Sequence, residues 1–163
     1  MTYDEFLKSK EYQSIESGFD AKYLNENLFD YQEAIVKWAL RKGRAALFED
    51  TGLGKTIQQL SWAESVHKHT NEPVLILAPL AVAEQTKQEA HKFGIHCELC
   101  SSQEDVVNGV NITNYDKLHK FDTDVFSGIV LDESSIIKSY SGKTTNELLE
   151  RFAHTPYKLC CTA

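Results

Sequence analysis

Several features that would assign this sequence to a class of protein are missing from its 163 residues. No apolar run approaches the length needed to span a membrane, and residues 1–10 are too polar and acidic to form a signal peptide. Internal repeats, low-complexity tracts and linkers are also lacking. We therefore expect one globular domain in the cytoplasm, or in the host cytoplasm if the gene is viral, with no membrane partner.

A surplus of positive charge is lacking as well. The chain has 17 lysines and arginines against 24 aspartates and glutamates, which gives a formal net charge of −7. Proteins that bind nucleic acid on their own gain most of their affinity by neutralising phosphates. The charge balance therefore argues against a free-standing nucleic-acid binder, although it allows a contact made by backbone amides or by a further region.

The cysteine pattern does not describe a metal site. Cys97 and Cys100 have the spacing of half a zinc site, but Cys160 and Cys161 are adjacent, which is not the spacing of a tetrahedral centre. Both pairs lie in strand-like segments, where a free cysteine behaves as a small hydrophobic residue. We therefore expect reduced thiols in the core.

A glycine loop between a strand and a helix is the most informative segment that is present. An apolar run over residues 45–48 predicts a buried strand, and apolar residues spaced by three over 57–66 predict an inward helix face. Glycines let such a loop turn its N–H groups towards phosphate oxygens, beside the positive end of the helix dipole. Lys55 is expected to place a positive charge near the β- and γ-phosphates, and Thr56 a hydroxyl that ligates Mg²⁺. The segment comprises Glu49, Asp50, Thr51, Gly52, Leu53, Gly54, Lys55 and Thr56.

The strict phosphate-loop pattern has a glycine at the position of Glu49. The alternative interpretation is therefore a surface turn that happens to contain Gly-Lys-Thr. The apolar strand before the loop and the amphipathic helix after it favour a nucleotide site.

Helices and strands alternate along the rest of the chain. This order predicts an α/β fold with a mostly parallel sheet and helices on both faces, in which ligands bind at the carboxyl ends of the strands. A fully apolar run at 74–78 suits a strand that is covered on both faces. Further strands are expected at 95–99, 110–112, 129–131 and 157–161, and helices at 31–40, 56–69, 82–93, 115–119 and 147–152.

Two helices near the N-terminus are predicted from weaker signals. A short helix that leans on the domain is suggested by Phe6, Leu7, Tyr12 and Ile15. Asp30 and Glu33 have the spacing of a capping box that opens the helix over residues 31–40. The expected apolar face of that helix comprises Tyr31, Ile35, Trp38 and Ala39.

Two adjacent carboxylates follow the apolar run at 129–131. At the end of a strand, Asp132 can hold Mg²⁺ while Glu133 orients or deprotonates an attacking water. Taken alone, such a pair more often marks the solvated start of a helix. Beside a phosphate loop in the same sheet, it is the expected second half of an ATPase.

Together these motifs resemble the first RecA-like lobe of superfamily-two helicases, in the DEAD/DEAH-like branch related to Swi/Snf-type translocases, and phage helicases in particular. Residues 50–56 match the Asp-x-Gly-x-Gly-Lys-Thr form of motif I in that branch, and residues 129–139 resemble motif II. The adenine-reading motif, motifs Ia and Ib, and the opening of motif III resemble, in that order, residues 28–32, 77–80, 112–116 and 159–163. The resemblance covers residues 28–163 and leaves residues 1–27 as an N-terminal helical extension.

The resemblance implies a function and a role for each motif. The chain would be the ATP-binding lobe of an ATP-dependent helicase or translocase, with ATP and Mg²⁺ as ligands and DNA, or alternatively RNA, as a partner. Gln32 would read the adenine edge, with Phe29 or Tyr31 packing near the base. The catalytic residues would be Lys55, Asp132 and Glu133; the nucleotide-binding ones Gln32, Thr51, Gly52, Leu53, Gly54, Lys55 and Thr56; the Mg²⁺ ligands Thr56 and Asp132; the nucleic-acid contacts Pro79, Leu80 and Tyr115; and the coupling residue Thr162.

Two departures from the family pattern qualify these roles. Ser134 and Ser135 replace the Ala-His or Ala-Asp of the named boxes, so the histidine that links motif II to motif III is absent. The sequence also ends at Thr162-Ala163, before the second RecA-like lobe that supplies arginine fingers in the family. We therefore expect a fragment or a truncated gene whose isolated activity is weak or absent.

Three alternatives remain open at this point. The rival function is a standalone nucleotide-binding or interaction module with little or no hydrolysis. A small kinase with a phosphate loop is less compatible, because such enzymes need a lid with arginines. For individual residues the alternatives are structural: Gln32 as a solvated helix residue, Pro79 as a strand end and Tyr115 as a helix start.

Overall fold

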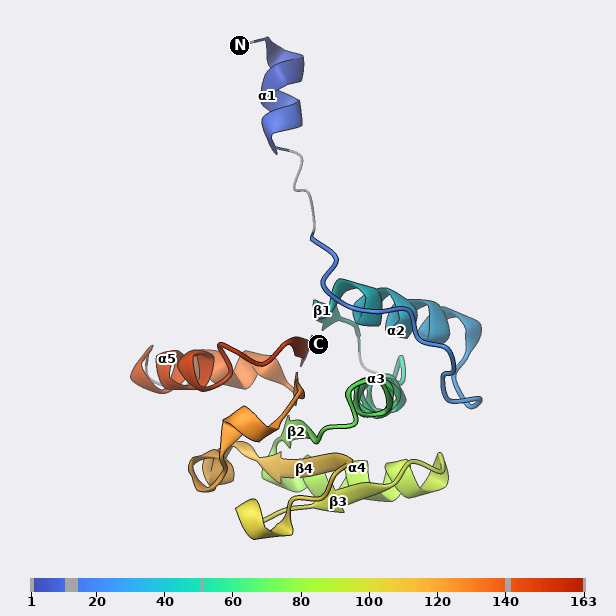
Figure 1. The fold of residues 1–163 in the computed structure, drawn as a ribbon, viewed down its shortest axis with the longest axis vertical. Coiled ribbons are helices and arrows are strands. Elements are labelled where there is room, and N and C mark those ends of the chain that lie inside the picture. Colours follow the sequence, from blue (N-terminus) through green and yellow to red (C-terminus); the bar gives the residue numbers. More distant parts are fainter. Residues whose placement is uncertain (1, 11–14, 51, 140–141, 163) are drawn as a thin grey trace.

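The computed structural model describes residues 2–10, 15–50, 52–139 and 142–162. Within them, six strands form one parallel sheet in the order β1-β6-β5-β2-β4-β3 (Figure 1), which confirms the predicted α/β fold. The strands are β1 (Arg44–Phe48), β2 (Val74–Ala78), β3 (Cys97–Leu99), β4 (Val110–Asn114), β5 (Gly128–Leu131) and β6 (Tyr157–Thr162). The α-helices are α1 (Tyr3–Lys10), α2 (Asp30–Lys42), α3 (Lys55–Thr70), α4 (Leu80–Lys92) and α5 (Gly142–Arg151).

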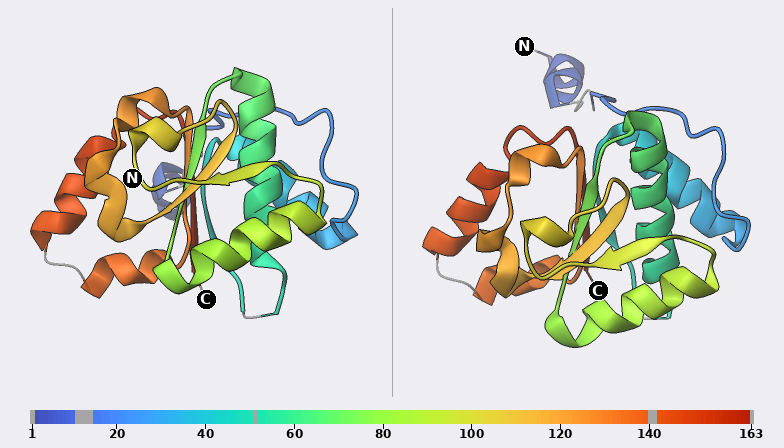
Figure 2. Two further views of the ribbon diagram at one scale, coloured as in Figure 1. Left: turned by 90° about the horizontal axis from the view of Figure 1, so that it is seen from below. Right: turned by 60° about the horizontal axis from the view of Figure 1, so that its bottom comes forward.

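Helices cover both faces of the sheet (Figure 2). Helices α2, α3 and α4 pack on one face, and α5 packs on the other together with the short 3₁₀ helices that follow β4 and β5. The helix predicted at 115–119 is one of these, η2 (Tyr115–Lys120), and another is η4 (Ser134–Ser139). All residues of β2, β4 and β5 are buried, as expected for strands covered on both faces.

Helix α3 lies at the centre of the first face. Its predicted inward face is confirmed, because burial is complete or nearly so for Ile57, Leu60, Ala63 and Val66. Trp62 is also fully buried, and an ideal Cβ on Gly128 would lie 3.5 Å from its ring. The same Cβ would lie 3.0 Å from Val66 Cγ1, which is tighter than ordinary contact, so glycine at that position lets α3 lie close to the start of β5.

The inward face of helix α2 was predicted in part, because Ala39 is buried and Ile35 packs against the core. Its N-cap residue is Phe29 rather than Asp30, and the Phe29 N–H donates to Gln32 Oε1, so the predicted capping box was wrong. Tyr31 and Trp38, expected on the buried face, are 46% and 45% exposed. The apolar pattern failed here because the polar Gln32 is buried by its hydrogen bonds. The buried residues of α2 are Gln32, Val36, Ala39 and Leu40.

Helix α1 does not lean on the domain but stands apart from it (Figure 1). Phe6 is 45% exposed and Ile15 is 86% exposed, while Tyr12 lies outside the described residues. The chain meets the domain at residues 17–19, whose N–H groups donate to the last carbonyls of α2 at 3.0–3.3 Å. The expected contact was wrong because α1 is mostly polar and has little apolar surface to bury.

Strand β1 was predicted to be buried, but it forms an edge of the sheet. Among the described residues it pairs with β6 alone. Leu47 is its one buried residue, and Phe48 at its end is 79% exposed. An apolar run predicts a strand without showing whether that strand is central or at an edge.

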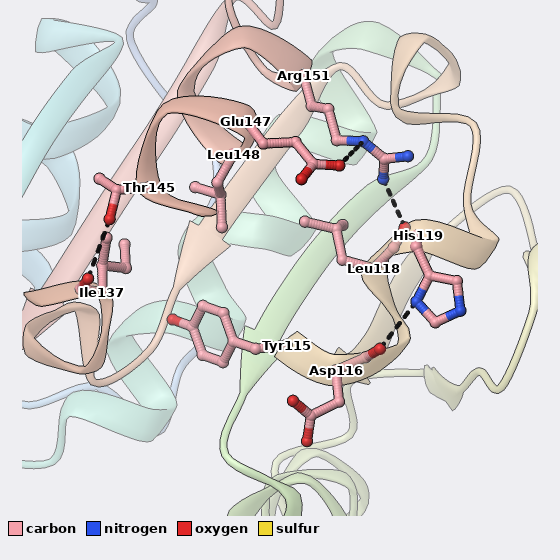
Figure 3. Close-up of a pocket in the computed structure, with 9 residues that line it drawn as sticks. All are labelled: Tyr115, Asp116, Leu118, His119, Ile137, Thr145, Glu147, Leu148 and Arg151. Atoms are coloured by element: carbon pink, nitrogen blue, oxygen red, sulfur yellow. Dashed lines mark hydrogen bonds and ion pairs between the residues drawn. The ribbon is translucent and has the colours of Figure 1, made fainter. Parts of the chain in front are cut away.

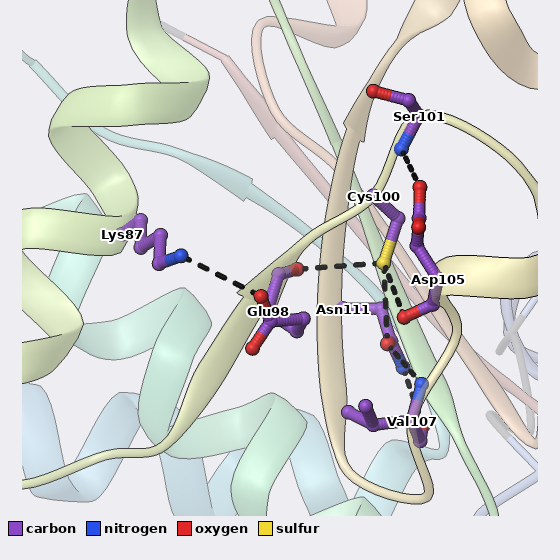
Figure 4. A network of polar contacts seen from close by, with 7 residues as sticks. All are labelled: Lys87, Glu98, Cys100, Ser101, Asp105, Val107 and Asn111. Atoms are coloured by element: carbon purple, nitrogen blue, oxygen red, sulfur yellow. Dashed lines mark hydrogen bonds and ion pairs between the residues drawn. The ribbon is translucent and has the colours of Figure 1, made fainter.

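The cysteines are free, and Cys97, Cys100 and Cys161 are buried in the apolar clusters, as predicted. Figure 4 shows the Cys100 thiol donating to Asn111 Oδ1 at 3.5 Å and to the Asp105 carbonyl at 3.4 Å. Burial raises the pKa of Cys97 to about 12 and that of Cys100 to about 11. The described residues contain no group of three or more metal-ligating side chains, and no helix among them is long and apolar enough to cross a membrane.

Candidate nucleotide-binding site

The predicted motifs meet at the carboxyl ends of neighbouring strands. The glycine loop follows β1, Thr162 ends β6, and Asp132 and Glu133 follow β5. These three strands are adjacent in the sheet, and the Glu49 N–H donates to the Thr162 carbonyl at 3.2 Å. The fold therefore brings motifs I, II and III together, because adjacent parallel strands have their carboxyl ends at the same edge of the sheet.

The glycine loop turns tightly into α3. Gly52 and Gly54 have φ values of +86° and +75°, in the left-handed region that glycine adopts without steric cost. Gly54 is the N-cap of α3, and no side chain of the described residues caps that helix, so its first N–H groups are left for an anion. Thr51 and Ala163, which were assigned to motifs I and III, lie outside the described residues.

Lys55 and Thr56 occupy the first turn of α3 and are half-buried. The Lys55 ammonium donates to the Glu49 carbonyl at 3.0 Å, across the mouth of the loop. Its charge is therefore held at the loop by a neutral acceptor rather than by a carboxylate. This donor set fits the polyphosphate of a nucleotide, because it combines a lysine, a hydroxyl and backbone N–H groups at a positive helix end.

Gln32 connects α2 to the glycine loop. It is 3% exposed, and its Nε2 donates to the Leu53 carbonyl at 2.9 Å while its Oε1 accepts from the Phe29 N–H at 2.9 Å. The Tyr31 hydroxyl donates to the same Leu53 carbonyl at 3.1 Å. The alternative of a solvated helix residue was therefore wrong, and the proposed reading of adenine stays a prediction. The exposed Phe29 and Tyr31 rings stack beside it, with centroids 6.2 Å apart.

Gly54 and Gly52 offer a matched pair of substitutions. Both have positive φ, so alanine at either position costs about 1–2 kcal/mol. A Cβ on Gly54 would also lie 2.3 Å from Gln32 Nε2, whereas a Cβ on Gly52 would meet nothing within 4 Å. We expect Gly54→Ala to lower the free energy of unfolding by about 1 kcal/mol more than Gly52→Ala, because it breaks the hydrogen bond from Gln32 to Leu53. Urea denaturation of both variants measures this difference.

Gln32→Ala supplies the control for that comparison. In a Gln32→Ala background the obstructing amide is gone, so the two glycine substitutions should cost the same. If Gly54→Ala and Gly52→Ala lower the free energy of unfolding equally with Gln32 present, the Gln32 amide moves aside without a loss of stability, which contradicts the prediction.

Asp132 is buried at the end of β5, and two hydrogen bonds orient its carboxylate. It is 8% exposed, and its Oδ1 accepts from Gln59 Nε2 at 2.8 Å and from the Glu133 N–H at 3.0 Å. The Asp132 N–H donates to the Leu77 carbonyl at 2.8 Å, which extends the pairing of β5 with β2. Glu133 has a φ of +50°, an unusual value for a residue with a side chain. Strain of this kind is often found at functional sites.

The predicted nucleic-acid residues lie farther along the same edge. Pro79 is the N-cap of α4 after β2, and Leu80 in its first turn is 70% exposed. Tyr115 begins η2 after β4, and its hydroxyl donates to the Asp132 carbonyl at 2.6 Å. Tyr115 therefore supports the motif II backbone, and its contact with nucleic acid stays a prediction.

Two buried polar residues of α3 were missed by the sequence analysis. Gln58 and Gln59 are 0% and 1% exposed. Gln58 Nε2 donates to Glu49 Oε2 at 2.9 Å and to the Leu53 carbonyl at 3.2 Å, so it links the two ends of the loop. Their signal in the sequence is a pair of glutamines inside an otherwise buried helix, with Gln59 one turn after Lys55.

A separate cavity of about 240 Å³ lies between η2, η4 and α5 (Figure 3). Leu118 and Leu148 form part of its apolar lining, and Arg151 donates to the Leu118 carbonyl at 2.8 Å. Its lining does not include the glycine loop or Asp132, although Tyr115 contributes to it. The candidate nucleotide site described above is the glycine loop at the carboxyl ends of the strands and not this cavity.

Comparison with known sequences places these motifs in context. The sequence model of the SNF2-related domain matches residues 31–163. The SWI/SNF-related matrix-associated actin-dependent regulator of chromatin subfamily A-like protein 1 of Xenopus laevis is 31% identical over 134 residues, which cover 76% of this chain and 14% of that relative. Protein CHROMATIN REMODELING 8 of Arabidopsis thaliana is 35% identical over 71 residues, covering 40% of this chain and 6% of that relative. The chain thus spans a small part of the length of the curated relatives it matches.

Two solved structures have the same fold. The UvsW helicase from bacteriophage T4 matches with a TM-score of 0.72 at 17% identity, covering 98% of this chain and 58% of that one. The SWI2/SNF2 ATPase core of Sulfolobus solfataricus in complex with dsDNA matches with a TM-score of 0.71 at 22% identity, covering 88% of this chain and 33% of that one. At these identities the likeness concerns the fold alone, and it confirms the RecA-like arrangement of the sheet.

Proposed function

The chain belongs to the SNF2-related domain family, and from this membership we propose that residues 28–163 form the ATP-binding lobe of a DNA-dependent helicase or translocase. Residues 1–27 would be an extension of that lobe. A second RecA-like lobe would be its partner, because the chain covers 14% of the Xenopus laevis relative and 33% of the Sulfolobus core.

The observation that carries the proposal is the meeting of three motifs at one edge of the sheet. The loop after β1, the end of β6 and the carboxylates after β5 come from adjacent strands. A standalone structural domain has no need of a lysine at the start of α3 and a carboxylate pair at the same edge. An ATPase needs both, because phosphate charge must be neutralised while water is activated.

Each side chain would have a distinct task towards Mg·ATP. Lys55 and the first N–H groups of α3 would hold the β- and γ-phosphates, with Gly52, Leu53 and Gly54 shaping the loop. Thr56 and Asp132 would hold Mg²⁺, which when bound neutralises part of the phosphate charge. Glu133 would accept a proton from the attacking water. Gln32 would contact the adenine edge while its hydrogen bond to the loop keeps it in place, with Phe29 and Tyr31 beside the base.

The nucleic-acid contact would lie along the same edge, beside motif II. Leu80 and the uncapped N-terminus of α4 are exposed there, and backbone N–H groups at a helix start suit a DNA phosphate. This mode fits a chain with a net charge of −7, since it needs no basic patch. The dsDNA in the Sulfolobus structure favours duplex DNA over RNA as the partner. Thr162 would then couple hydrolysis to movement between lobes.

Calorimetric titration of Mg·ATP into the purified chain tests the proposal. We expect saturable binding at one site, weaker binding when EDTA removes the Mg²⁺, and binding of a 20-base-pair DNA duplex in preference to an RNA duplex. A folded chain that binds no nucleotide would contradict the proposal. Nucleotide binding by a chain that neither binds DNA nor changes its nucleotide affinity when DNA is added would instead favour a standalone nucleotide-binding module.

A further inference from the structure

Gln59 is a buried side chain that joins the helix of motif I to motif II. It lies on α3 one turn after Lys55, and its Nε2 donates to Asp132 Oδ1 at 2.8 Å. On β6, burial raises the pKa of the Cys161 thiol, and the Gln59 amide opposes that rise. Cys161 directly precedes Thr162, and β6 lies between β1 and β5 in the sheet.

The contact with Asp132 fixes the direction of its carboxylate. Oδ1 receives two donors, Gln59 Nε2 and the Glu133 N–H, and hydrogen bonds to a charged group are stronger than those between neutral groups. Among the described residues no hydrogen bond to Asp132 Oδ2 is found, so this is the oxygen left for a ligand. Because Gln59 is 1% exposed, no water competes freely for its position.

The neighbouring glutamine shows that this arrangement is particular to Gln59. Gln58 lies next to it on α3 and is equally buried, yet its amide contacts Glu49 and Leu53 in the loop rather than Asp132. The two glutamines therefore serve different parts of the site. Gln58 ties the loop together, and Gln59 reaches the carboxylate.

We propose that Gln59 is a positioning residue that holds the Asp132 carboxylate in the orientation needed to bind Mg²⁺. This inference rests on the proposed function. Residues that orient a metal ligand through a hydrogen bond change metal affinity by about 10–100-fold when they are removed. Gln59 would thereby set how strongly Mg²⁺ improves ATP binding, without touching the nucleotide itself.

Gln59→Met tests this assignment, because methionine has a similar length and donates no hydrogen bond. ATP binding is measured by calorimetry in EDTA and at increasing Mg²⁺ concentrations. We expect the affinity in EDTA to stay within twofold of wild type, while the Mg²⁺ concentration giving half of the affinity gain rises about 10–100-fold. A merely structural role would weaken binding in EDTA and in Mg²⁺ alike.

Two further variants keep the result interpretable. Gln88→Met changes an exposed glutamine of α4 and should leave both measurements unchanged. Asp132→Asn removes the carboxylate on which Gln59 acts, so adding Gln59→Met to it should change the Mg²⁺ dependence no further. If Gln59→Met unfolds the chain, Gln59→Leu takes its place, with thermal unfolding as the check.

The outcomes separate this inference from the proposed function. Wild-type binding of Mg·ATP with an unchanged Mg²⁺ dependence in the folded Gln59 variant would overturn the inference alone. A wild-type chain that binds no Mg·ATP would overturn the proposed function and the inference with it. An additive effect of Gln59→Met in the Asp132→Asn background would show that Gln59 acts by a route other than the carboxylate.

Discussion

Replacing Lys55 with alanine is expected to abolish binding of Mg·ATP while leaving the chain folded. Lys55 is the one lysine of the loop, and its ammonium already lies across the loop mouth on the Glu49 carbonyl. Without it, the triphosphate would meet backbone N–H groups but no full positive charge, in a chain whose net charge is −7. We expect the affinity for Mg·ATP to fall at least about 100-fold, since charge-assisted hydrogen bonds to phosphate contribute roughly 1.5–3 kcal/mol each.

The fold should survive the loss of Lys55 because its bond to a single carbonyl is a small part of the packing of α3. Lys68→Ala is the matched control, since Lys68 lies on the same helix, is exposed and forms an ion pair with Glu64. Calorimetry measures the binding of both variants, and circular dichroism follows their thermal unfolding. If Lys55→Ala binds Mg·ATP with wild-type affinity, the glycine loop is not part of the nucleotide site.

Replacing Glu133 with glutamine is expected to leave Mg·ATP binding intact and to lower hydrolysis about 10²–10⁴-fold, the usual contribution of a general base. Glutamine has the same shape as glutamate, so it adopts the φ of +50° at this position as readily as glutamate does. The substitution therefore removes the basic carboxylate while the backbone keeps its conformation. Asp132, whose Oδ1 accepts from the Glu133 N–H, would keep both of its donors.

Because the isolated lobe is expected to hydrolyse ATP weakly, phosphate release is followed in single turnovers, with the chain in excess over Mg·ATP and duplex DNA present, and calorimetry measures the binding. Glu150→Gln supplies a control for the loss of one negative charge, since Glu150 is exposed on α5, which packs under the opposite face of the sheet from α3. Markedly weaker binding in Glu133→Gln would mean that Glu133 holds the nucleotide rather than acting on water. Unchanged hydrolysis with unchanged binding would assign the proton transfer to another group.

Apolar runs and the glycine loop made most of the fold predictable. Residues 74–78 and 129–131 predicted buried strands, and the structure has them as β2 and β5 at the centre of the sheet. The spacing after the loop predicted the inward face of α3. These signals are local, and a run that is apolar on every residue or on one helical face leaves few alternatives.

Two buried polar residues were not predicted because their partners are distant in the sequence. Gln32 binds Leu53 of the loop and so lies on the inward face of α2, from which the apolar pattern excluded it. Gln59 binds Asp132, 73 residues away. Periodicity alone treats a polar side chain in a helix as solvent-facing and does not predict such a partner.

The edge position of β1 has a consequence for local dynamics. Strand β1 carries the glycine loop, yet in the described residues it is hydrogen-bonded on one side only, whereas β5, which carries Asp132 and Glu133, is paired on both sides. Amide hydrogen exchange in the ligand-free chain should therefore be fast along β1 and slow along β5, because opening an edge strand breaks half as many bonds. The loop proposed to hold phosphate thus follows an edge strand, and the carboxylate pair follows a strand that is paired on both sides. Nucleotide binding would then slow amide exchange in β1, whereas exchange in β5, which is already slow, would change little.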